Sequence, residues 1–181
     1  FDDHPFGRVF EAAGDAYPGS PFVAGELLRN DDSLTLAELH PLEAAALAEA
    51  MMPYPAIVKQ IDGFQLAMSM SPPNPRRGLL LCDPSFEIKS DYTDIPDFFR
   101  KLHRRWPVGI LVLWYPILVD ERHRPMVDAL RAIFPNGVNH TVLFTPARAG
   151  HGMIGSGLFV VNPPYGFEDA AQQLEQKFKA L

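Results

Sequence analysis

The chain has 181 residues, of which 47% are hydrophobic, and a formal net charge of −6. This length accommodates one domain with a substantial core, so we expect a single domain over residues 1–181. The negative charge argues against nucleic-acid binding through the overall field, and any such contact must be local. The single cysteine, Cys82, excludes an internal disulfide and favours a reducing compartment, the cytoplasm.

Other classes of protein are disfavoured by what the sequence lacks. No apolar run approaches the roughly 20 residues of a spanning helix, so we expect no membrane partner. The histidines show no metal-ligand spacing, so we expect no metal. The chain opens at Phe1 with no strand ahead of its first helical pattern, and we interpret it as the later portion of a longer protein.

Short apolar runs alternate with helical patterns along the chain, which is typical of βαβ units and a largely parallel sheet. The last two runs have no convincing helix between them, which predicts an antiparallel hairpin through residues 146–156. We expect strands at Leu34–Leu39, Ala56–Ile61, Gly78–Cys82, Val108–Trp114, His140–Phe144 and Gly157–Val161. We expect helices at Pro21–Arg29, Pro41–Met51, Ile95–Arg105, Glu121–Phe134 and Phe167–Leu181.

Three acids lie at or just after the ends of successive predicted strands: Glu38, Asp62 and Asp83. The carboxyl ends of parallel strands meet at one edge of a sheet, so we expect three carboxylates facing one crevice. A nucleoside-bearing cofactor explains this arrangement, because one acid can hold ribose hydroxyls and another can accept a hydrogen bond from the adenine amine. The alternative is that each acid caps a helix or a turn.

The motifs of several common activities are missing. A G-x-G-x-x-G pattern occurs at residues 150–155, but it lies between the last two predicted strands and not between a strand and a helix, and no G-x-x-x-x-G-K is present, which disfavours nicotinamide and nucleoside triphosphate cofactors. No serine lies in a G-x-S-x-G turn, so nucleophilic hydrolysis has no candidate. A nicotinamide-dependent enzyme remains open only if residues ahead of Phe1 supply the fingerprint.

Five segments together resemble the RlmJ family of ribosomal RNA large-subunit adenine-N6 methyltransferases. The resemblance implies a class I S-adenosylmethionine-dependent methyltransferase (Rossmann-like) sheet with an antiparallel edge hairpin. It also implies S-adenosyl-L-methionine as the cofactor and ribosomal RNA, single-stranded or unassembled at the target, as the partner. The segments are AYPGSPFVAGELLRNDDSLTLAELHP, DGF, RRGLLLCDPSFEIKSDY, VLWYPILV and GSGLFVVNPPY.

The resemblance assigns cofactor contacts to Ser20, Glu38, Asp62 and Gly63. The family places a further strand and a glycine-containing cofactor loop ahead of these residues, and neither is present here.

The resemblance assigns the catalytic loop to Asp83, Pro84 and Phe86. Asp83 and the carbonyl of Pro84 would accept hydrogen bonds from adenine N6 and so localise its lone pair. Phe86 would stack on a base that is flipped out or already single-stranded. The family loop has a second proline where this chain has Ser85, so a non-catalytic RNA- or adenosine-binding relic of the same fold is the alternative.

Two further features have competing interpretations. An Asn-Pro-Pro-Tyr segment at residues 162–165 resembles a catalytic loop, but it ends the last predicted strand, and we do not expect it to be catalytic. Basic residues at 100–106, with Arg122, His123 and Arg124, form either a contact for RNA phosphates or a solvated helix face.

Overall fold

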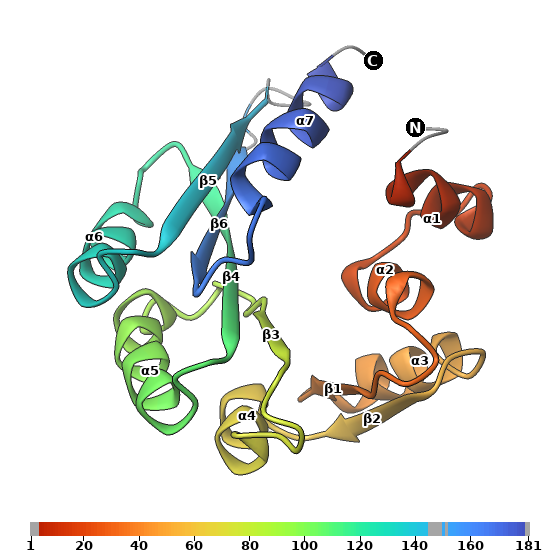
Figure 1. The fold of residues 1–181 in the computed structure, drawn as a ribbon. Helices are drawn as coiled ribbons and strands as arrows, with labels where there is room; N and C mark the ends of the chain where they lie inside the picture. Colours follow the sequence, from red (N-terminus) through yellow and green to blue (C-terminus); the bar gives the residue numbers. More distant parts are fainter. Residues whose placement is uncertain (1–3, 145–149, 151, 180–181) are drawn as a thin grey trace. The chain divides into compact units, whose positions relative to one another are not determined.

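The computed structural model describes residues 4–144, 150 and 152–179. The chain divides into two compact units, Phe1–Leu66 (unit 1) and Ala67–Leu181 (unit 2). Figure 1 shows the elements of each unit. Unit 1 contains α1 (Pro5–Ala13), α2 (Ser20–Leu27), β1 (Leu34–Glu38), α3 (Pro41–Ala50) and β2 (Ala56–Gln60), and α4 (Gly63–Met70) runs across the boundary.

Unit 1 is built on one βαβ connection. β1 and β2 pair in parallel, with Leu34 opposite Ala56 and Glu38 opposite Gln60. The crossover helix α3 starts at Pro41, where the missing N–H of proline has no helical partner to lose. Both strands and this helix confirm the predicted elements to within one residue at each end. The two strands therefore end at the same edge of their sheet.

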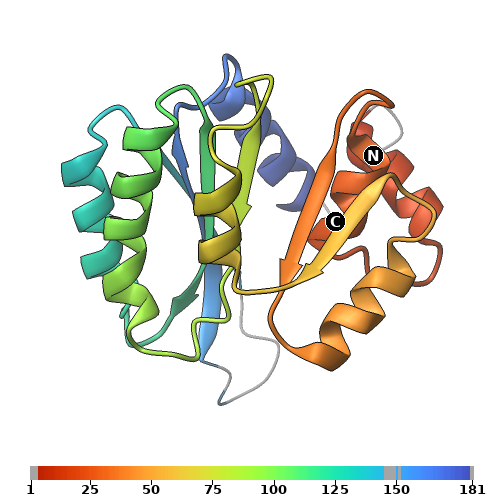
Figure 2. The ribbon, with the colours of Figure 1, turned by 90° about the horizontal axis from the view of Figure 1, so that it is seen from below.

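Unit 2 is a four-stranded sheet in the order β3-β4-β6-β5. β3 and β4 are parallel, whereas β6 is antiparallel to both β4 and β5, which confirms the predicted antiparallel pair. Figure 2 shows α5 and α6 on one face of this sheet and α7 on the other. The elements are β3 (Leu79–Cys82), α5 (Asp91–Arg105), β4 (Ile110–Leu118), α6 (Arg124–Ile133), β5 (Val138–Leu143), β6 (Met153–Val161) and α7 (Phe167–Lys179).

The core of unit 2 follows from the helical and strand periods of its sequence. Ile95, Phe99 and Leu102 recur at helical spacing on α5 and have no exposed surface. Leu111 and Leu113 on one face of β4 have no exposed surface, and Val112 on the other face is 9% exposed, as expected for a strand covered on both faces. No helix within the described residues is long and apolar enough to cross a membrane.

The side chain of Tyr115 extends over the neighbouring strand at Gly157. Tyr115 of β4 lies opposite Gly157 of β6, and a Cβ on that glycine would lie 2.1 Å from the tyrosine ring. The Tyr115 hydroxyl donates to Oδ1 of Asn139 on β5 at 2.7 Å. One side chain therefore links three strands, and Gly157 is required for its passage.

Several elements differ from the predictions. Helices α1 and α4 were not expected, β4 continues to Leu118, and β6 begins at Met153. Helix α5 begins four residues earlier than predicted, at Asp91. The predicted turn of the hairpin and the predicted end of the last helix include residues 146–149, 151 and 180–181, which lie outside the described residues.

Candidate active site

Glu38 and Asp62 lie at the same edge of the β1–β2 pair, as predicted. Glu38 ends β1, and its carbonyl accepts from the N–H of Ile61 at 3.1 Å, directly before Asp62. Both carboxylates also have local hydrogen bonds: Glu38 Oε1 accepts from the N–H of His40, and Asp62 Oδ1 from the N–H of Gln65, each at 2.8 Å. The capping alternative is therefore realised at both acids.

Capping leaves part of each carboxylate available. A carboxylate has two oxygens and about four lone-pair sites, so one backbone bond does not saturate it. Within the described residues, neither Glu38 nor Asp62 accepts a second hydrogen bond or forms an ion pair. The acceptors that remain suit ribose hydroxyls and an adenine amine, which are all donors.

The other two predicted cofactor residues lie at helix starts in unit 1. Ser20 is the exposed first residue of α2, and Gly63 is the exposed first residue of α4. A Cβ on Gly63 would meet Ala37 Cβ at 3.7 Å, an ordinary van der Waals contact. The packing of the chain itself therefore does not require glycine at position 63.

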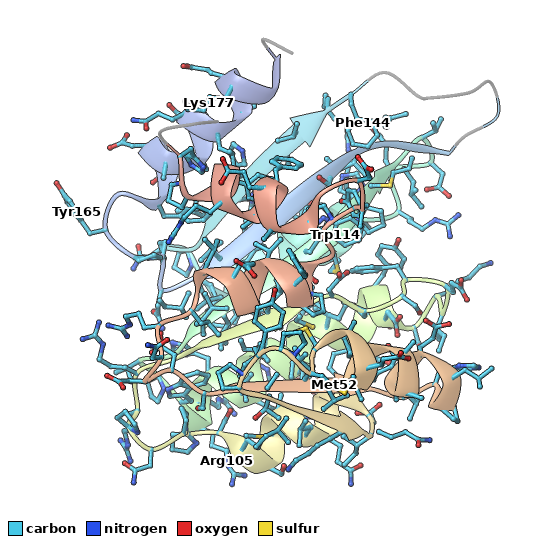
Figure 3. The ribbon with its side chains drawn as sticks, turned by 90° about the vertical axis from the view of Figure 1, so that its right-hand side faces the viewer. Met52, Arg105, Trp114, Phe144, Tyr165 and Lys177 are labelled. Carbon is cyan, nitrogen blue, oxygen red and sulfur yellow. The ribbon has the colours of Figure 1, made fainter. Side chains whose placement is uncertain are left out.

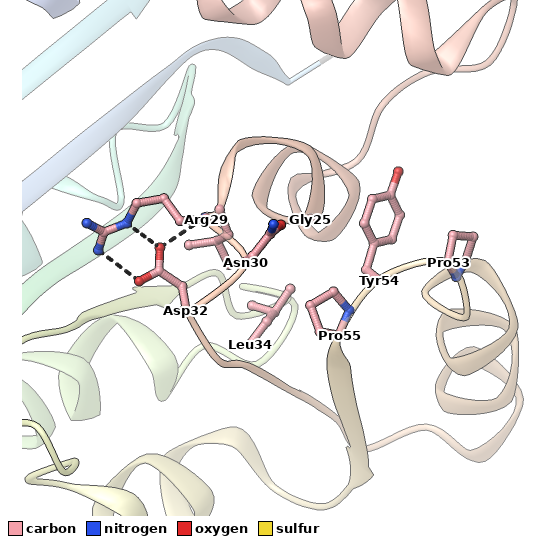
Figure 4. Close-up of a pocket in the computed structure, with 9 residues that line it drawn as sticks. Gly25, Arg29, Asn30, Asp32, Leu34, Pro53, Tyr54 and Pro55 are labelled. Carbon is pink, nitrogen blue, oxygen red and sulfur yellow. Dashed lines mark hydrogen bonds and ion pairs between the residues drawn. The ribbon is translucent and has the colours of Figure 1, made fainter.

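A cavity in unit 1 lies away from this edge. It measures about 200 Å³ and lies at the amino ends of the two strands, where Leu34 starts β1 and Pro55 precedes β2. Arg29 and Asp32 form an ion pair of 2.9 Å at this cavity, and Tyr54 also lines it (Figure 4). The cavity is smaller than the roughly 300–1,000 Å³ of typical cofactor pockets, and none of the predicted site residues lines it.

Asp83 follows the carboxyl end of β3 in unit 2. Its carboxylate has no hydrogen bond or ion pair with the described residues, and desolvation raises its pKa above the ordinary range. A carboxylate with a raised pKa is a stronger base. The neighbouring Pro84 is half-buried, and its carbonyl accepts from no backbone N–H of the described residues. Two acceptors therefore lie side by side at this strand end.

Phe86 lies in a strained and packed position. Its φ is +56°, a value that non-glycine residues adopt rarely, and its side chain is only 6% exposed. The ring lies 4.9 Å from the ring of Tyr92, centroid to centroid, at an interplanar angle of 46°. Burial raises the pKa of Asp91, and the nearby Phe86 backbone partly offsets that rise. The structure thus packs Phe86 against α5, and stacking on an adenine remains a prediction.

The sequence analysis missed Tyr92, and it treated His123 only as part of a basic surface. The Tyr92 hydroxyl and His123 Nδ1 are buried and have no hydrogen-bond partner among the described residues. His123 stacks on Tyr115 at 5.5 Å, and burial, followed by the charge of Arg124, lowers its pKa. An aromatic six positions after Phe86, at the start of a helix, was the available signal for Tyr92.

The Asn-Pro-Pro-Tyr segment lies at the opposite edge of unit 2 from Asp83. Val161 at the end of β6 pairs with Leu111 near the start of β4, whereas Cys82 at the end of β3 pairs with Leu113. Asn162 has a φ of +54°, and its Nδ2 donates to the carbonyls of Pro107 and Gly109, each at 2.8 Å. This asparagine ties two loops together and is far along the strand direction from the candidate catalytic loop.

A family model described as "Ribosomal RNA large subunit methyltransferase D, RlmJ" matches residues 10–180, nearly the whole chain. The chain belongs to the RlmJ family. The match includes both edges described above, and the mixed sheet with its antiparallel edge pair confirms the α/β fold that the resemblance implied.

Named relatives agree with this family assignment. Ribosomal RNA large subunit methyltransferase J of Escherichia coli (strain K12) is 38% identical over 154 residues, which cover 84% of this chain and 55% of the relative. The protein of the same name from Haemophilus influenzae is 32% identical over 160 residues, covering 87% and 57%. The chain thus spans little more than half the length of these RlmJ relatives.

A solved structure supports the fold. The crystal structure of protein LPL1258 from Legionella pneumophila matches with a TM-score of 0.86 at 29% sequence identity. The match covers 96% of this chain and 67% of that chain.

Proposed function

We propose that this RlmJ-family chain contributes the substrate loop and part of the cofactor site of an S-adenosylmethionine-dependent methyltransferase that modifies adenine N6 in ribosomal RNA. The observation that carries the proposal is the Asp83-Pro84 pair of acceptors at the end of β3, in a chain that matches the RlmJ family over residues 10–180. We further propose that the protein acts in the cytoplasm.

Glu38 and Asp62 would hold the cofactor, and Ser20 and Gly63 would complete the contacts from two helix starts. S-adenosylmethionine, when bound, supplies the electrophilic methyl group. The free carboxylate oxygens of Glu38 and Asp62 match the hydroxyl and amine donors of its adenosine part. The proposal that Asp83 joins them in one crevice extends across both units and stays a prediction.

Asp83 and Pro84 would prepare the nucleophile. The lone pair of adenine N6 is delocalised into the ring, and hydrogen bonds from its two N–H groups to the Asp83 carboxylate and the Pro84 carbonyl localise it. As the N–C bond forms, the S–C bond to the methyl group of the donor would break, and the nitrogen becomes positive and must lose one proton. Desolvation raises the pKa of Asp83, which improves this carboxylate as the proton acceptor. Positioned acid–base assistance contributes about 10²–10⁴ in rate.

Phe86 would act after a local rearrangement. Its ring rests on Tyr92 and the residue is only 6% exposed, so the loop must move before a base can stack on this ring. Tyr92 is therefore a candidate positioning residue for the loop.

The test compares Asp83→Asn with the matched control Asp94→Asn in the full-length protein. Asp94 is an exposed acid in the first turn of α5, so its loss changes the charge equally. We expect Asp83→Asn to lower N6-methyladenine formation in RNA, measured by nucleoside mass spectrometry, at least a hundredfold. Cofactor affinity, measured by calorimetry, should stay within a few-fold in both variants. An unchanged rate in Asp83→Asn contradicts the assignment of the loop.

A second candidate function rests on Ser85. This exposed residue stands where the family loop has its second proline, so the loop loses one restriction on φ. A non-catalytic RNA- or adenosine-binding role follows if the parent protein binds cofactor and RNA but transfers no methyl group to any RNA.

A further inference from the structure

The arginines of unit 2 that the structure describes fall into two classes. Those of the first class each pair with a carboxylate two or three positions away: Arg100 with Asp97, Arg122 with Asp120, Arg124 with Glu121, and Arg131 with Asp128. These pairs favour the solvated-helix interpretation of the basic residues at 100, 122 and 124. Arg76, Arg77, Arg104 and Arg105 are exposed and pair with no carboxylate among the described residues of unit 2.

The four arginines of the second class come from two segments that Trp106 holds together. The indole Nε1 of Trp106 donates to the carbonyl of Arg76 at 2.7 Å, and Nε of Arg105 donates to the carbonyl of Ser71 at 2.5 Å. The Trp106 side chain is 4% exposed, and a Cβ on Gly109 would lie 2.3 Å from its ring. The segment before β3 and the end of α5 therefore form one rigid scaffold.

A third segment joins the same scaffold and adds an aromatic ring. Asn162 donates to the carbonyls of Pro107 and Gly109, next to Trp106. Three residues later, after two prolines, Tyr165 is fully exposed at 107%, and Figure 3 shows its side chain pointing away from the chain. We call Arg76, Arg77, Arg104, Arg105 and Tyr165 the amino-edge surface.

This surface lies at the edge where β3 and β4 begin, whereas Asp83 follows the end of β3. Arg77 and Asp83 are six positions apart across the strand, which corresponds to about 20 Å at roughly 3.3 Å per residue. An RNA stem with an adjoining single-stranded segment is long enough to span that distance. The surface and the candidate catalytic loop can therefore contact one RNA at separate points.

We propose that the amino-edge surface is a second RNA contact, in which the arginines bind phosphates and Tyr165 stacks on an unpaired base. This inference rests on the proposed function, because it takes RNA as the substrate. Guanidinium groups bind phosphate in a bidentate geometry, and exposed aromatic rings stack on single-stranded bases. The presence of both groups on one scaffold favours RNA over an acidic protein, which offers no base for Tyr165.

The test measures RNA binding without turnover, in full-length protein that carries Asp83→Asn. The triple variant R76A/R77A/R104A is compared with the matched control R122A/R124A/R131A, which removes the same charge from ion-paired arginines. Arg105 is kept because it bonds to the Ser71 carbonyl. The probe is a ribosomal RNA fragment with a stem and a single-stranded adenine, titrated at several salt concentrations.

In R76A/R77A/R104A, we expect the plot of log association constant against log salt concentration to become less steep by about 2. We expect the affinity for RNA to fall about a hundredfold at 0.1 M salt. The control R122A/R124A/R131A should leave both the salt dependence and the RNA affinity nearly unchanged. Tyr165→Ala should weaken binding about 5- to 150-fold, and Tyr165→Phe should restore it, because phenylalanine keeps the stacking face.

Equal losses in the two triple variants, or an unchanged slope in the first, overturn the proposal. A second outcome assigns the surface to an acidic protein instead. In that outcome, a polyglutamate peptide competes with RNA for the parent but not for R76A/R77A/R104A, and this variant keeps its RNA affinity. Failure of the proposed function is a separate result: the parent with Asp83 intact then transfers no methyl group, whatever the triple variants bind.

Discussion

Asp62 has two roles that substitution can separate. Its Oδ1 accepts from the N–H of Gln65 at 2.8 Å, which is the geometry of a helix N-cap at the start of α4, and its other oxygen is available to a cofactor. Serine caps a helix about as well as aspartate, but it is shorter and neutral, whereas alanine does not cap. Asp62→Ser and Asp62→Ala should therefore differ in their free energy of unfolding, but both remove the carboxylate that would bind the cofactor.

The expected magnitudes follow from these contacts. Loss of an N-cap costs about 1 kcal/mol, so Asp62→Ala should lower the free energy of unfolding by about that amount, and Asp62→Ser by a few tenths at most. A hydrogen bond to a charged group contributes about 1.5–3 kcal/mol, so both variants should bind S-adenosylmethionine about 10- to 150-fold more weakly. Urea denaturation and calorimetric titration of the full-length protein give the two quantities.

One outcome contradicts this reasoning directly. If Asp62→Ser keeps both the stability and the cofactor affinity of the parent, the carboxylate is a helix cap and nothing more. In that case the arrangement of Asp62 beside Glu38 reflects the ends of two parallel strands and not a binding site.

Two further predictions concern unit 2. Gly157→Ala should destabilise the full-length protein by about 1–3 kcal/mol in urea denaturation, because the added Cβ would lie 2.1 Å from the Tyr115 ring. The control Gly152→Ala, where a Cβ would meet nothing within 4 Å, should change the free energy of unfolding by no more than about 0.5 kcal/mol. Equal effects of the two substitutions would contradict the packing argument. Burial, followed by Asp83 and Asp91, raises the pKa of the Cys82 thiol to about 12. Below that pH the thiol stays protonated, and only the thiolate reacts with iodoacetamide. At pH 8, iodoacetamide should therefore modify Cys82 about a thousandfold more slowly in the folded protein than in the protein unfolded by urea, as measured by peptide mass spectrometry. Similar rates in the folded and unfolded protein would refute the raised pKa.

The sequence predicted the elements whose residues have a single interpretation. Apolar runs such as Leu34–Leu39 and Gly78–Cys82 became strands because nothing in them competes with a strand. Helix α4 was missed because Asp62 and Gly63 were interpreted as site residues, although an acid followed three positions later by Gln65 is also a helix start. Helix α1 was missed because its cap is a histidine, His4, an uncommon N-cap residue.

The predicted end of β4 and the predicted start of β6 were wrong because a proline or a glycine lies within each strand. Pro116 suggested that β4 had ended, but β3 pairs only as far as Leu113, so the proline faces an unpaired edge and needs no donor on that side. The last strand was predicted to begin only at Gly157, yet β6 includes Gly155, where Leu143 packs closely, and Gly157, where the Tyr115 ring passes. Such close approaches depend on neighbours that are distant in the sequence.

The candidate site was predicted as a set of strand ends, and that part depends only on parallel pairing. The same analysis could not predict that Phe86 packs on Tyr92 or that Asn162 bonds to two carbonyls, because both depend on side-chain directions at positive φ.

The indole of Trp106 gives this protein a built-in optical probe. The chain has two tryptophans, and Trp106 is the one whose N–H bonds directly to the backbone of Arg76, beneath the amino-edge surface. Replacing Trp114 by phenylalanine would leave a single emitter in this chain, and its emission wavelength and quenching would then depend on the loop that carries the unpaired arginines. Changes at that loop could then be followed in solution in real time, without a label and without waiting for a chemical product.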